Sequence, residues 1–584
     1  HNSVVLRNDG QDPSTLNYDL NAGITKAVTI RVNSTQALAV IYDLSEVATA
    51  NPLTSDTNGN YAFKASDNIY DIIISEGTAE EVKIEKVEVI ATSNLISDLS
   101  QAYEFTTRQL METSIIIFPP GKLLHVIEAD ADYVVTSGAT PNVSSPDLTT
   151  GLHAHLQIYN NQVTLLQLGA AEDASGDGVE AGTTDDTAYW QYAKTLGIDV
   201  IVSRKSMISA SIAGNTSSFK GVLSEYISQV VINPTVNSNN WFDHLDVSNI
   251  SFYKLGFIGN GLGSGGGLAG AIRFQTSANS VRNLSVTHCY FQNFNQNYWV
   301  YFNNVISSFE MNKVTASDNV FVSMSGNDID PTFSGVPACC IGFQGSYSDK
   351  AGKIKNLEAN RNRMSCLYIK QGIAVWANCH GGEIAHNNIE NNGQHASGQD
   401  DASNYAIIMY TNRFLFGTPD YDYDPSGIES HNNTIVNPRD CGYYLQGLVE
   451  SSIYSNNISG QTSTADASIP KGAIASNGCH SVDIYSNTMK NNVFDLALAC
   501  VNYKNDRDIT VRAYSNDCLS NTAATVKISP NGSVGEGYKS TLYATDNVVK
   551  GSIFVPFALA SENFTCHIKG GEVSESSLNG INFF

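Results

Sequence analysis

Short apolar runs recur at regular intervals from about residue 245 to the end of the chain. Residues 271–275, 340–344 and 494–498 alternate apolar with polar side chains, which is the period of a β-strand rather than that of a helix. Turns that carry Asn or Asp separate these runs, and the shortest repeat between turns is about 24 to 31 residues. This repeat predicts an all-β fold, a right-handed parallel β-helix in which each repeat is one coil.

The turns share an asparagine or aspartate followed by an apolar run. They read Asp318-Asn319-Val320, Arg361-Asn362-Arg363, Asn387-Asn388-Ile389, Asn432-Asn433-Thr434, Asn456-Asn457-Ile458, Asn487-Thr488-Met489, Asn516-Asp517-Cys518 and Asp546-Asn547-Val548. Asparagine tolerates left-handed backbone dihedrals, and its side-chain amide can bond to the amide of the neighbouring coil. We therefore expect an asparagine ladder with a structural role.

Two intervals between turns are longer than one coil, 44 residues from Asp318 to Asn362 and 45 residues from Asn387 to Asn432. Insertions of this kind project from a solenoid as loops, often on its binding face. We expect inserted loops at about 321–355 and 391–427.

The first 170 residues are organised differently. Residues 1–90 contain alternating strand runs joined by the turn-rich segment 56–60, which predicts a small β-sandwich that serves as an attachment module. Helical spacing of apolar residues over 91–112 predicts a connector helix, and 91–170 as a whole is expected to form a connector with a small β-rich module. The β-helix then occupies 171–584.

A helix is expected at the start of the β-helix. Gly176-Asp177-Gly178-Val179 is followed by Thr184-Asp185-Asp186-Thr187-Ala188, where Thr184 or Asp185 suits the helix N-cap and the apolar pattern continues to Leu196. The open end of a solenoid exposes unpaired backbone and apolar interior, so it needs a cap of this kind.

These motifs, with the strand Val200-Ile201-Val202 after the helix, resemble the start of the β-helix in the pectate-lyase-like superfamily. The strand-rich front module, with residues 56–61, resembles the attachment regions of bacteriophage tail proteins, and the two together resemble a phage tailspike. The resemblance implies a homotrimer whose N-terminus binds other phage tail or baseplate proteins. It also implies a place in the virion tail, after assembly in the host cytoplasm, and action outside the bacterial cell on a surface polysaccharide.

Composition limits the partners. The chain of 584 residues has a formal net charge of -24, which argues against nucleic acid and anionic membrane surfaces because both attract basic patches. It contains no apolar stretch of the roughly eighteen residues that a membrane span requires, so no membrane insertion is expected. The sequence begins at His1 rather than Met, and we expect further residues upstream.

All ten cysteines lie between Cys289 and Cys566, inside the predicted solenoid and often within apolar runs. Unoxidised cysteine behaves as a small buried hydrophobic residue, so we expect reduced thiols that line the coil interior and folding in a reducing cytoplasm. No CxxC pair is present, and neither a metal nor another cofactor is expected.

Outward-facing positions at one level of successive coils should form a surface row. On the strands that precede the turns, aromatic, amide and guanidinium side chains suit sugar rings and their hydroxyl groups. The predicted substrate-binding residues are Arg273, Gln275, Gln344, Trp376, Asn378, Tyr410 and Asn412, and Tyr301 and Asn303 share the row. A solvated face or a subunit interface would use the same residue types.

Glycosidic hydrolysis usually needs two carboxylates, one that protonates the leaving oxygen and one that attacks or activates water. The candidates are Glu383, Glu390, Asp400 and Asp401, which bracket the coils of Trp376 and Tyr410. A general acid among them needs a raised pKa, as crowding by a second carboxylate would provide.

The expected activity is a depolymerase that binds and cleaves a bacterial capsule or O-antigen, with hydrolysis favoured because acids outnumber bases in the inserted segments. A polysaccharide lyase is the alternative, with a base among Arg361, Arg363, His386 and Lys370. A glycan-binding adhesin that cleaves nothing is a further alternative, whereas a passive fibre would not need long loops on particular coils.

Overall fold

The computed structural model describes residues 2–6, 27–42, 48–54, 61–65, 68–78, 81–89, 102–116, 118–137, 144, 146–148, 152–174, 183–222, 229–233, 235–236, 240–260, 270–294, 298–304, 308–322, 339–346, 349–367, 369–391, 404–411, 423–463, 471–499, 508–520, 525–529, 539–550, 553–554, 564–570 and 572–573. The chain divides into two compact units, His1–Gln157 and Ile158–Phe584.

The N-terminal unit begins with two four-stranded antiparallel sheets, ordered β1-β6-β3-β4 and β5-β2-β7-β8. Their strands are β1 (Asn2–Leu6), β2 (Ala27–Val32), β3 (Ile41–Tyr42), β4 (Ala48–Thr49), β5 (Leu53–Thr54), β6 (Tyr61–Ala65), β7 (Asn68–Ile74) and β8 (Val82–Val89). Buried side chains from both sheets, among them Ile30, Ile41 and Ile72, form one apolar core. The predicted small β-sandwich is thereby confirmed.

A third sheet in this unit is ordered β12-β11-β10-β9. It contains β9 (Tyr103–Phe105), β10 (Leu123–Val126), β11 (Ala131–Thr136) and β12 (His153–Leu156), with α2 (Arg108–Glu112) and the short turn η1 (Ile127–Ala129) between strands. The predicted connector helix over 91–112 is wrong where the structure describes it. Residues 103–105 pair as a strand with β10, and the helix is limited to one turn and a half.

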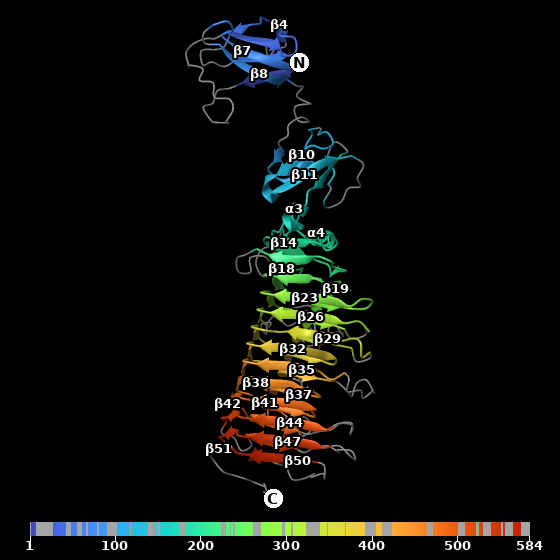
Figure 1. Cartoon of the computed structure of the whole chain (residues 1–584), viewed down its shortest axis with the longest axis vertical. Helices are drawn as coiled ribbons and strands as arrows, with labels where there is room; N and C mark the ends of the chain where they lie inside the picture. The colour runs from blue at the N-terminus through green and yellow to red at the C-terminus, as the bar shows by residue number, and fades with distance from the viewer. Residues whose placement is uncertain are drawn as a thin grey trace. The chain divides into compact units, whose positions relative to one another are not determined.

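The larger unit is a right-handed parallel β-helix built from sheets of 14, 13 and 12 strands, in which every strand pairs in parallel with the corresponding strand of the next coil (Figure 1). The 14-stranded sheet contains β13 (Gln162–Thr164), β14 (Asp199–Val202), β17 (Ser218–Gly221), β20 (Ile250–Tyr253), β23 (Val281–Thr287), β26 (Met311–Ser317), β29 (Ile354–Glu358), β32 (Cys379–Ala385), β35 (Ser426–His431), β38 (Ser451–Tyr454), β41 (Ser481–Tyr485), β44 (Ile509–Tyr514), β47 (Ser540–Thr545) and β50 (Phe564–Lys569).

The 13-stranded sheet contains β15 (Lys205–Ile208), β18 (Gln229–Ile232), β21 (Gly256–Ile258), β24 (Tyr290–Gln292), β27 (Val320–Val322), β30 (Arg363–Ser365), β33 (Asn388–Glu390), β36 (Thr434–Val436), β39 (Asn457–Ser459), β42 (Thr488–Lys490), β45 (Asp517–Cys518), β48 (Val548–Val549) and β51 (Glu572–Val573). The 12-stranded sheet contains β16 (Ile212–Ala213), β19 (Asn240–Leu245), β22 (Gly270–Gln275), β25 (Tyr298–Asn303), β28 (Cys339–Gln344), β31 (Gln371–Trp376), β34 (Tyr405–Tyr410), β37 (Cys441–Gln446), β40 (Gly472–Asn477), β43 (Leu496–Ala499), β46 (Val526–Ser529) and β49 (Ile553–Phe554). No helix among the described residues is long and apolar enough to cross a membrane.

Two short helices, α3 (Leu165–Leu168) and α4 (Thr187–Ala193), lie at the first coils. Trp190 of α4 is fully buried, with its ring centroid 4.8 Å from that of Phe219 and 5.5 Å from that of Phe242, so the predicted helical cap is confirmed. The N-cap residue is Asp186 rather than Thr184 or Asp185, and the helix ends at Ala193. The motif at 176–179 lies outside the described residues.

The predicted asparagine ladder runs through eight coils. Its members are Asn319, Asn362, Asn387, Asn433, Asn456, Asn487, Asn516 and Asn547. In the first seven, Nδ2 donates to the Oδ1 atom of the next asparagine over 2.8 to 3.1 Å, and that Oδ1 atom also accepts the backbone N–H of the donor residue. The Nδ2 group of Asn547 ends the ladder by donating to the Ala513 carbonyl. The buried amides therefore satisfy one another and hold each turn level with its neighbours.

The left-handed residue of each turn is the one before the ladder asparagine. Its φ is +60° at Asp318, +56° at Arg361 and +53° at Asn432. The expectation that the ladder asparagines also supply this conformation is wrong, because none of them has a positive φ. They act through their side-chain amides alone.

The interior of the coils is filled by stacked apolar side chains. Phe274, Phe302 and Phe343 stack on consecutive strands of the 12-stranded sheet with 5.1 Å between ring centroids, and Phe252 of the opposite 14-stranded sheet lies 6.3 Å from Phe274. Residues that alternate with these phenylalanines along the strands must therefore point outward.

Nine of the ten cysteines lie among the described residues, all as free thiols, and eight of them are buried. Burial raises the pKa of Cys289 and Cys379 to about 12. The expectation that all of them line the coil interior is wrong for Cys339 and Cys441, which belong to an apolar cluster on the outer face of the 12-stranded sheet.

The ladder predicts a position-specific loss of stability. Asn456→Ala removes both a donor to Asn487 and the acceptor for Asn433, leaving buried amides without partners, so we expect the free energy of unfolding to fall by about 1 to 3 kcal/mol. The neighbouring exposed Asn457→Ala keeps its backbone pairing and should change stability little. Guanidinium unfolding of both variants measures this, and equal midpoints would show that the ladder adds no stability.

Burial of the thiols predicts their reactivity. Titration of the denatured protein with a thiol reagent should recover nearly ten free thiols, whereas the native protein should react slowly because the thiolate is disfavoured inside the coils. A denatured count near zero would mean that the cysteines are oxidised and would reject folding in a reducing compartment.

Candidate functional site

The outer face of the 12-stranded sheet carries the predicted substrate-binding row. Gln275, Gln344, Trp376 and Tyr410 occupy one register position on β22, β28, β31 and β34, so their predicted alignment is confirmed. Arg273 lies on the same outer face, two residues before Gln275 along β22. It pairs with Asp243, with 2.6 Å between Nη2 and Oδ2.

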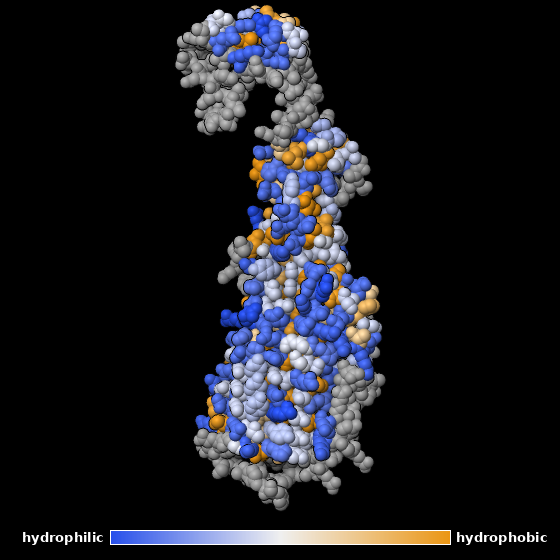
Figure 2. Space-filling model, viewed as in Figure 1, coloured by the Kyte–Doolittle hydropathy of each residue, from blue (hydrophilic) through white to orange (hydrophobic). Residues whose placement is uncertain are grey.

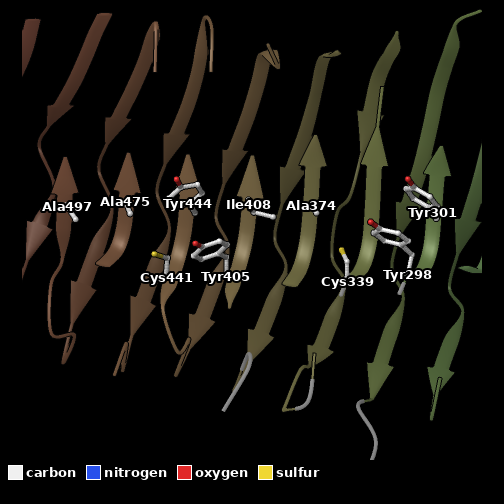
Figure 3. Packing of buried hydrophobic residues seen from close by; sticks show 10 residues of the cluster. All are labelled: Tyr298, Tyr301, Cys339, Ala374, Tyr405, Ile408, Cys441, Tyr444, Ala475 and Ala497. Atoms are coloured by element: carbon white, nitrogen blue, oxygen red, sulfur yellow. The ribbon is translucent and has the colours of Figure 1, made fainter. Parts of the chain in front are cut away.

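Most of this face is covered. Figure 3 shows its cluster of ten buried side chains, Tyr298, Tyr301, Cys339, Ala374, Tyr405, Ile408, Cys441, Tyr444, Ala475 and Ala497. The rings of Tyr298 and Tyr301 stack at 4.0 Å, and Trp376 and Tyr410 pack against the cluster while keeping some exposure. The expected open face is therefore wrong at Tyr301, which is buried, whereas Arg273, Gln275, Gln344, Trp376 and Tyr410 are each partly exposed.

Two asparagines of the predicted row differ from expectation. Asn378 is fully buried, with Nδ2 donating to the Gly352 carbonyl over 2.9 Å and Oδ1 bonded to His380 over 2.8 Å, so it holds the local chain instead of facing a ligand. Asn303 is also buried. Asn412 lies outside the described residues.

The outer face of the 14-stranded sheet is different in character. Figure 2 shows mostly hydrophilic and intermediate colours on the face where the strands β32 to β50 cross the front of Figure 1. Glu358, Glu383 and Glu429 occupy one register position on the consecutive strands β29, β32 and β35, and we name them the acid column. Neighbouring strands lie about 4.7 to 4.9 Å apart, so three carboxylates follow one another at that spacing.

A second column, of rings, lies two register positions further along the strands of the same sheet and begins on β35. His431, Tyr454, Tyr485 and Tyr514 occupy one register position on β35, β38, β41 and β44, and we name them the ring column. Their centroids are 4.7, 4.9 and 5.0 Å apart in that order. The two columns meet on β35, where Glu429 and His431 lie two residues apart, and the ring column continues from there toward the C-terminus.

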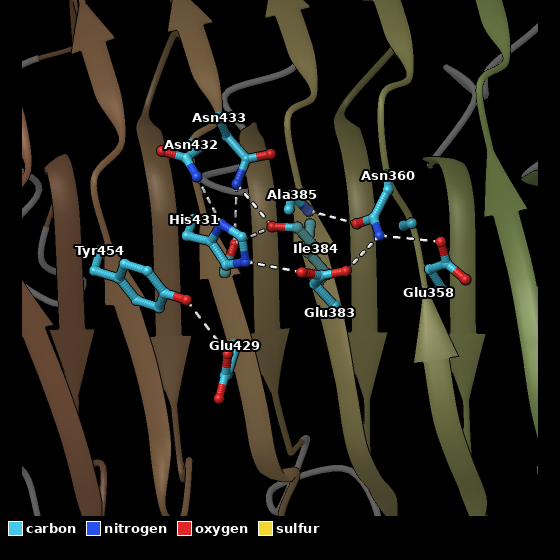
Figure 4. A network of polar contacts seen from close by, with 12 residues as sticks. Glu358, Asn360, Glu383, Ile384, Ala385, Glu429, His431, Asn432, Asn433 and Tyr454 are labelled. Atoms are coloured by element: carbon cyan, nitrogen blue, oxygen red, sulfur yellow. Dashed lines mark hydrogen bonds and ion pairs between the residues drawn. The ribbon is translucent and has the colours of Figure 1, made fainter.

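A hydrogen-bond network joins Glu358 and Glu383 of the acid column, whereas Glu429 bonds to Tyr454 (Figure 4). Asn360 donates from Nδ2 both to Glu358 Oε1 over 3.1 Å and to Glu383 Oε2 over 2.6 Å, so these two carboxylate oxygens lie within two hydrogen-bond lengths of each other. The Ala385 N–H donates to Asn360 Oδ1 over 2.7 Å, which fixes the orientation of the amide. Asn360 is itself buried, so the bridge is held from beneath.

His431 holds the other oxygen of Glu383. Its Nε2 lies 2.9 Å from Glu383 Oε1, and its Nδ1 lies 2.9 Å from the Nδ2 group of Asn432. An amide N–H donates to Nδ1, so Nε2 carries the ring proton and donates to the carboxylate. The ring is 12% exposed and stacks on Tyr454, whereas the side chain of Glu383 is 46% exposed.

These contacts keep Glu383 ionised. Partial burial acts to raise the pKa of Glu383, but the hydrogen bonds from Asn360 and His431 outweigh it and lower the pKa below the ordinary glutamate value. Among the four candidate acids, Glu383 therefore lacks the raised pKa that a general acid needs. An exposed, oriented carboxylate of this kind is suited to act as a base or nucleophile.

The other predicted acids do not join this network within the described part of the chain. Glu390 lies on β33 of the 13-stranded sheet, where its Oε1 accepts from Asn388 Nδ2 over 2.9 Å, so it does not share the face of Glu383. Asp400 and Asp401 lie outside the described residues.

Sequence reasoning missed Glu358, Asn360, Glu429 and His431. A signal was present, because Glu358, Glu383 and Glu429 each stand four residues before a ladder asparagine. The members of the ring column each stand two residues before one. Aligning the coils on their asparagines would have found both columns.

Cations near the columns are already paired. Arg361 donates to both oxygens of Asp318 over 2.7 and 2.9 Å, and Arg512 lies 3.1 Å from Asp483. His386 packs edge-on against His431, with 5.7 Å between centroids. Within the described ranges, no group of three or more His, Cys, Asp or Glu side chains is arranged to hold a metal ion.

No known family model and no curated protein matches the sequence. Solved structures with a similar fold include the A-module of the mannuronan C-5 epimerase AlgE4 from Azotobacter vinelandii, with 14% identity, 69% of this chain and 99% of that chain covered, and a TM-score of 0.47. The catalytic unit of a GH87 alpha-1,3-glucanase from Streptomyces thermodiastaticus has 13% identity, covers 94% and 86%, and has a TM-score of 0.46.

The enzymatically active domain of tailspike protein 2 from bacteriophage CBA120 has 12% identity, covers 73% of this chain and 61% of that chain, and has a TM-score of 0.44. Phage tailspikes are thus among the solved structures that this chain resembles, as its motifs predicted. The likeness concerns the fold alone.

Proposed function

We propose that this protein is a phage tailspike depolymerase that binds and cleaves a bacterial surface polysaccharide, a capsule or an O-antigen, by glycosidic hydrolysis. The observation that carries the proposal is the acid column, in which Asn360 links Glu358 to an ionised Glu383 on an outward-facing sheet. Hydrolysis of a glycosidic bond usually uses two carboxylates, and in retaining enzymes these lie only about 5 to 5.5 Å apart.

The two roles divide within the acid column. Glu383, held ionised by Asn360 and His431, acts as the nucleophile or the base. A flanking carboxyl group, Glu358 or Glu429, protonates the leaving oxygen. The strand spacing of about 4.8 Å is close to the carboxylate separation of roughly 5 to 5.5 Å in retaining glycosidases, which favours a double displacement.

Charge favours hydrolysis over elimination. A lyase acts on a uronate and must neutralise the substrate carboxylate with a cation or similar group. The proposed site instead contains three glutamates, and the nearby Arg361 and Arg512 are already engaged by aspartates. A polyanion would be repelled here, so we propose an uncharged polysaccharide as substrate.

We further propose that the protein is a homotrimer in the virion tail, with its N-terminal β-sandwich bound to other tail or baseplate proteins. The tailspike motifs of the sequence support this proposal. Closed cyclic symmetry is the usual form of such assemblies.

Amide variants test the assignment. Glu383→Gln keeps the shape of the side chain but removes its charge, and we expect at least a hundredfold loss of cleavage with the fold intact. One of Glu358 and Glu429 serves as the general acid. The glutamine variant of that residue should show a comparable loss of cleavage. The exposed Glu450→Gln is the matched control, and Glu390→Gln should also retain activity because it lies on another sheet.

The measurement uses purified capsule and O-chain polysaccharides, uncharged and uronate-containing, and follows new reducing ends, product size and ultraviolet absorbance of an unsaturated uronate. Absorbing products would identify a lyase. Binding without cleavage would identify an adhesin, and full activity of Glu383→Gln would place the site elsewhere.

The hydrogen bond from His431 predicts the acid limb of the pH profile. The ionised form of Glu383 is the active one, so kcat/KM should fall as pH drops through its lowered pKa. His431→Phe preserves a ring against Tyr454 but removes the donor, which raises the pKa and moves the limb to higher pH. Asn432 has a positive φ, which glycine adopts readily. Asn432→Gly leaves the contact between His431 and Glu383 in place, so it should move the acid limb less. An unchanged limb in His431→Phe would contradict this role of Glu383.

A further inference from the structure

The ring column continues past the acid column toward the C-terminus. Tyr454 and Tyr485 lie nearly parallel, with an interplanar angle of 6° and 4.9 Å between centroids, and Tyr485 and Tyr514 at 4° and 5.0 Å. Both faces of Tyr454 and Tyr485, and one face of Tyr514, are thus covered by a neighbouring ring. A ligand can therefore meet Tyr454 and Tyr485 only at their edges, where the hydroxyl groups stand.

The hydroxyl groups are available as donors. Those of Tyr485 and Tyr514 have no hydrogen-bond partner among the described residues, and both side chains are partly exposed. Burial raises the pKa of both phenols, so they stay protonated. The hydroxyl of Tyr454 donates to Glu429 Oε2 over 3.3 Å, which connects the row directly to the acid column.

We propose that Tyr454, Tyr485 and Tyr514 form a glycan-binding track that holds the uncharged polysaccharide on the C-terminal side of the cleavage site. This inference rests on the proposed function and deepens it. The chain would lie along the β-helix axis and cross one coil after another, with sugar hydroxyl groups bonded to the phenols.

The chemistry of the row indicates this occupant. A donor repeats at nearly constant steps of about 5 Å, which suits a polymer of repeated hydroxyl groups. Asp483 pairs with Arg512 beside the row, and Glu429 adds a negative charge at Tyr454, so these neighbours do not favour an anionic ligand. Continuity with Glu429 places its start at the proposed reaction centre.

The track makes cleavage depend on chain length. A substrate that extends over three coils gains phenol contacts that a short oligosaccharide cannot make. Long chains should therefore be cut at internal bonds with a lower KM than short ones.

Phenylalanine variants isolate the hydroxyl groups. Tyr485→Phe with Tyr514→Phe keeps the stacked rings, and in the Glu383→Gln background binding can be measured without turnover. The probes are the purified uncharged and uronate-containing polysaccharides, immobilised on a sensor surface. Loss of two hydrogen bonds should weaken binding of an uncharged polymer about tenfold.

The matched control is Tyr253→Phe. Tyr253 shares the ring-column register position but lies on β20, beyond Thr287 and Ser317 on the other side of the acid column. The Glu383→Gln protein that also carries Tyr253→Phe should bind the uncharged polymer as tightly as Glu383→Gln alone. Melting curves confirm that the variants keep the fold.

The outcomes separate the two proposals. If Glu383→Gln binds none of the uncharged polymers, or if the double phenylalanine variant binds as tightly as its parent, the track is overturned. If binding weakens as expected but the wild-type protein cleaves nothing, the track stands and the hydrolase proposal falls. A change of sedimentation mass in the double variant would instead make this face an interface between copies of the chain, which also overturns the track.

Discussion

The asparagine ladder is the constraint on which the rest of the β-helix depends. Each ladder amide bonds to the side chain and the backbone of its neighbours, so every turn stands at the same level as the next. Side chains alternate faces along a strand, and a slip of one residue would exchange interior and surface. By preventing that slip, the ladder lines up Glu358, Glu383 and Glu429 although 71 residues of sequence separate the first from the last.

The outer faces of two sheets use this alignment in opposite ways. On the 12-stranded sheet, small and aromatic side chains such as Ala374 and Tyr444 are packed and almost wholly buried. On the 14-stranded sheet, charged and phenolic side chains remain partly open. The long intervals in the sequence adjoin β28 and β34 of the covered sheet and also β35 of the 14-stranded sheet, so insertion length alone does not distinguish the two faces.

Within the proposed site, the supporting residues decide what the carboxylate can do. Glu383 would be an ordinary surface acid without the buried Asn360 beneath it and His431 beside it. Both are donors, and both stabilise its ionised form. The ring of His431 is in turn held by Tyr454, so the charge of the acid column and the stacking of the ring column are parts of one arrangement.

The sequence by itself determined the repeat, the strand periodicity, the ladder asparagines, the capping helix and the alignment of Gln275, Gln344, Trp376 and Tyr410, because these follow from local spacing and composition. It also placed Glu383 among four candidate acids, and its catalytic role stays a prediction. Only the tertiary structure decided that Asn378 is buried, that residues 103–105 are a strand, and that Glu390 and Glu383 lie on different sheets. The physical reason is that exposure, sheet membership and the lowered pKa of Glu383 arise from contacts between coils. Those contacts join residues 20 to 50 positions apart, beyond the reach of any local pattern.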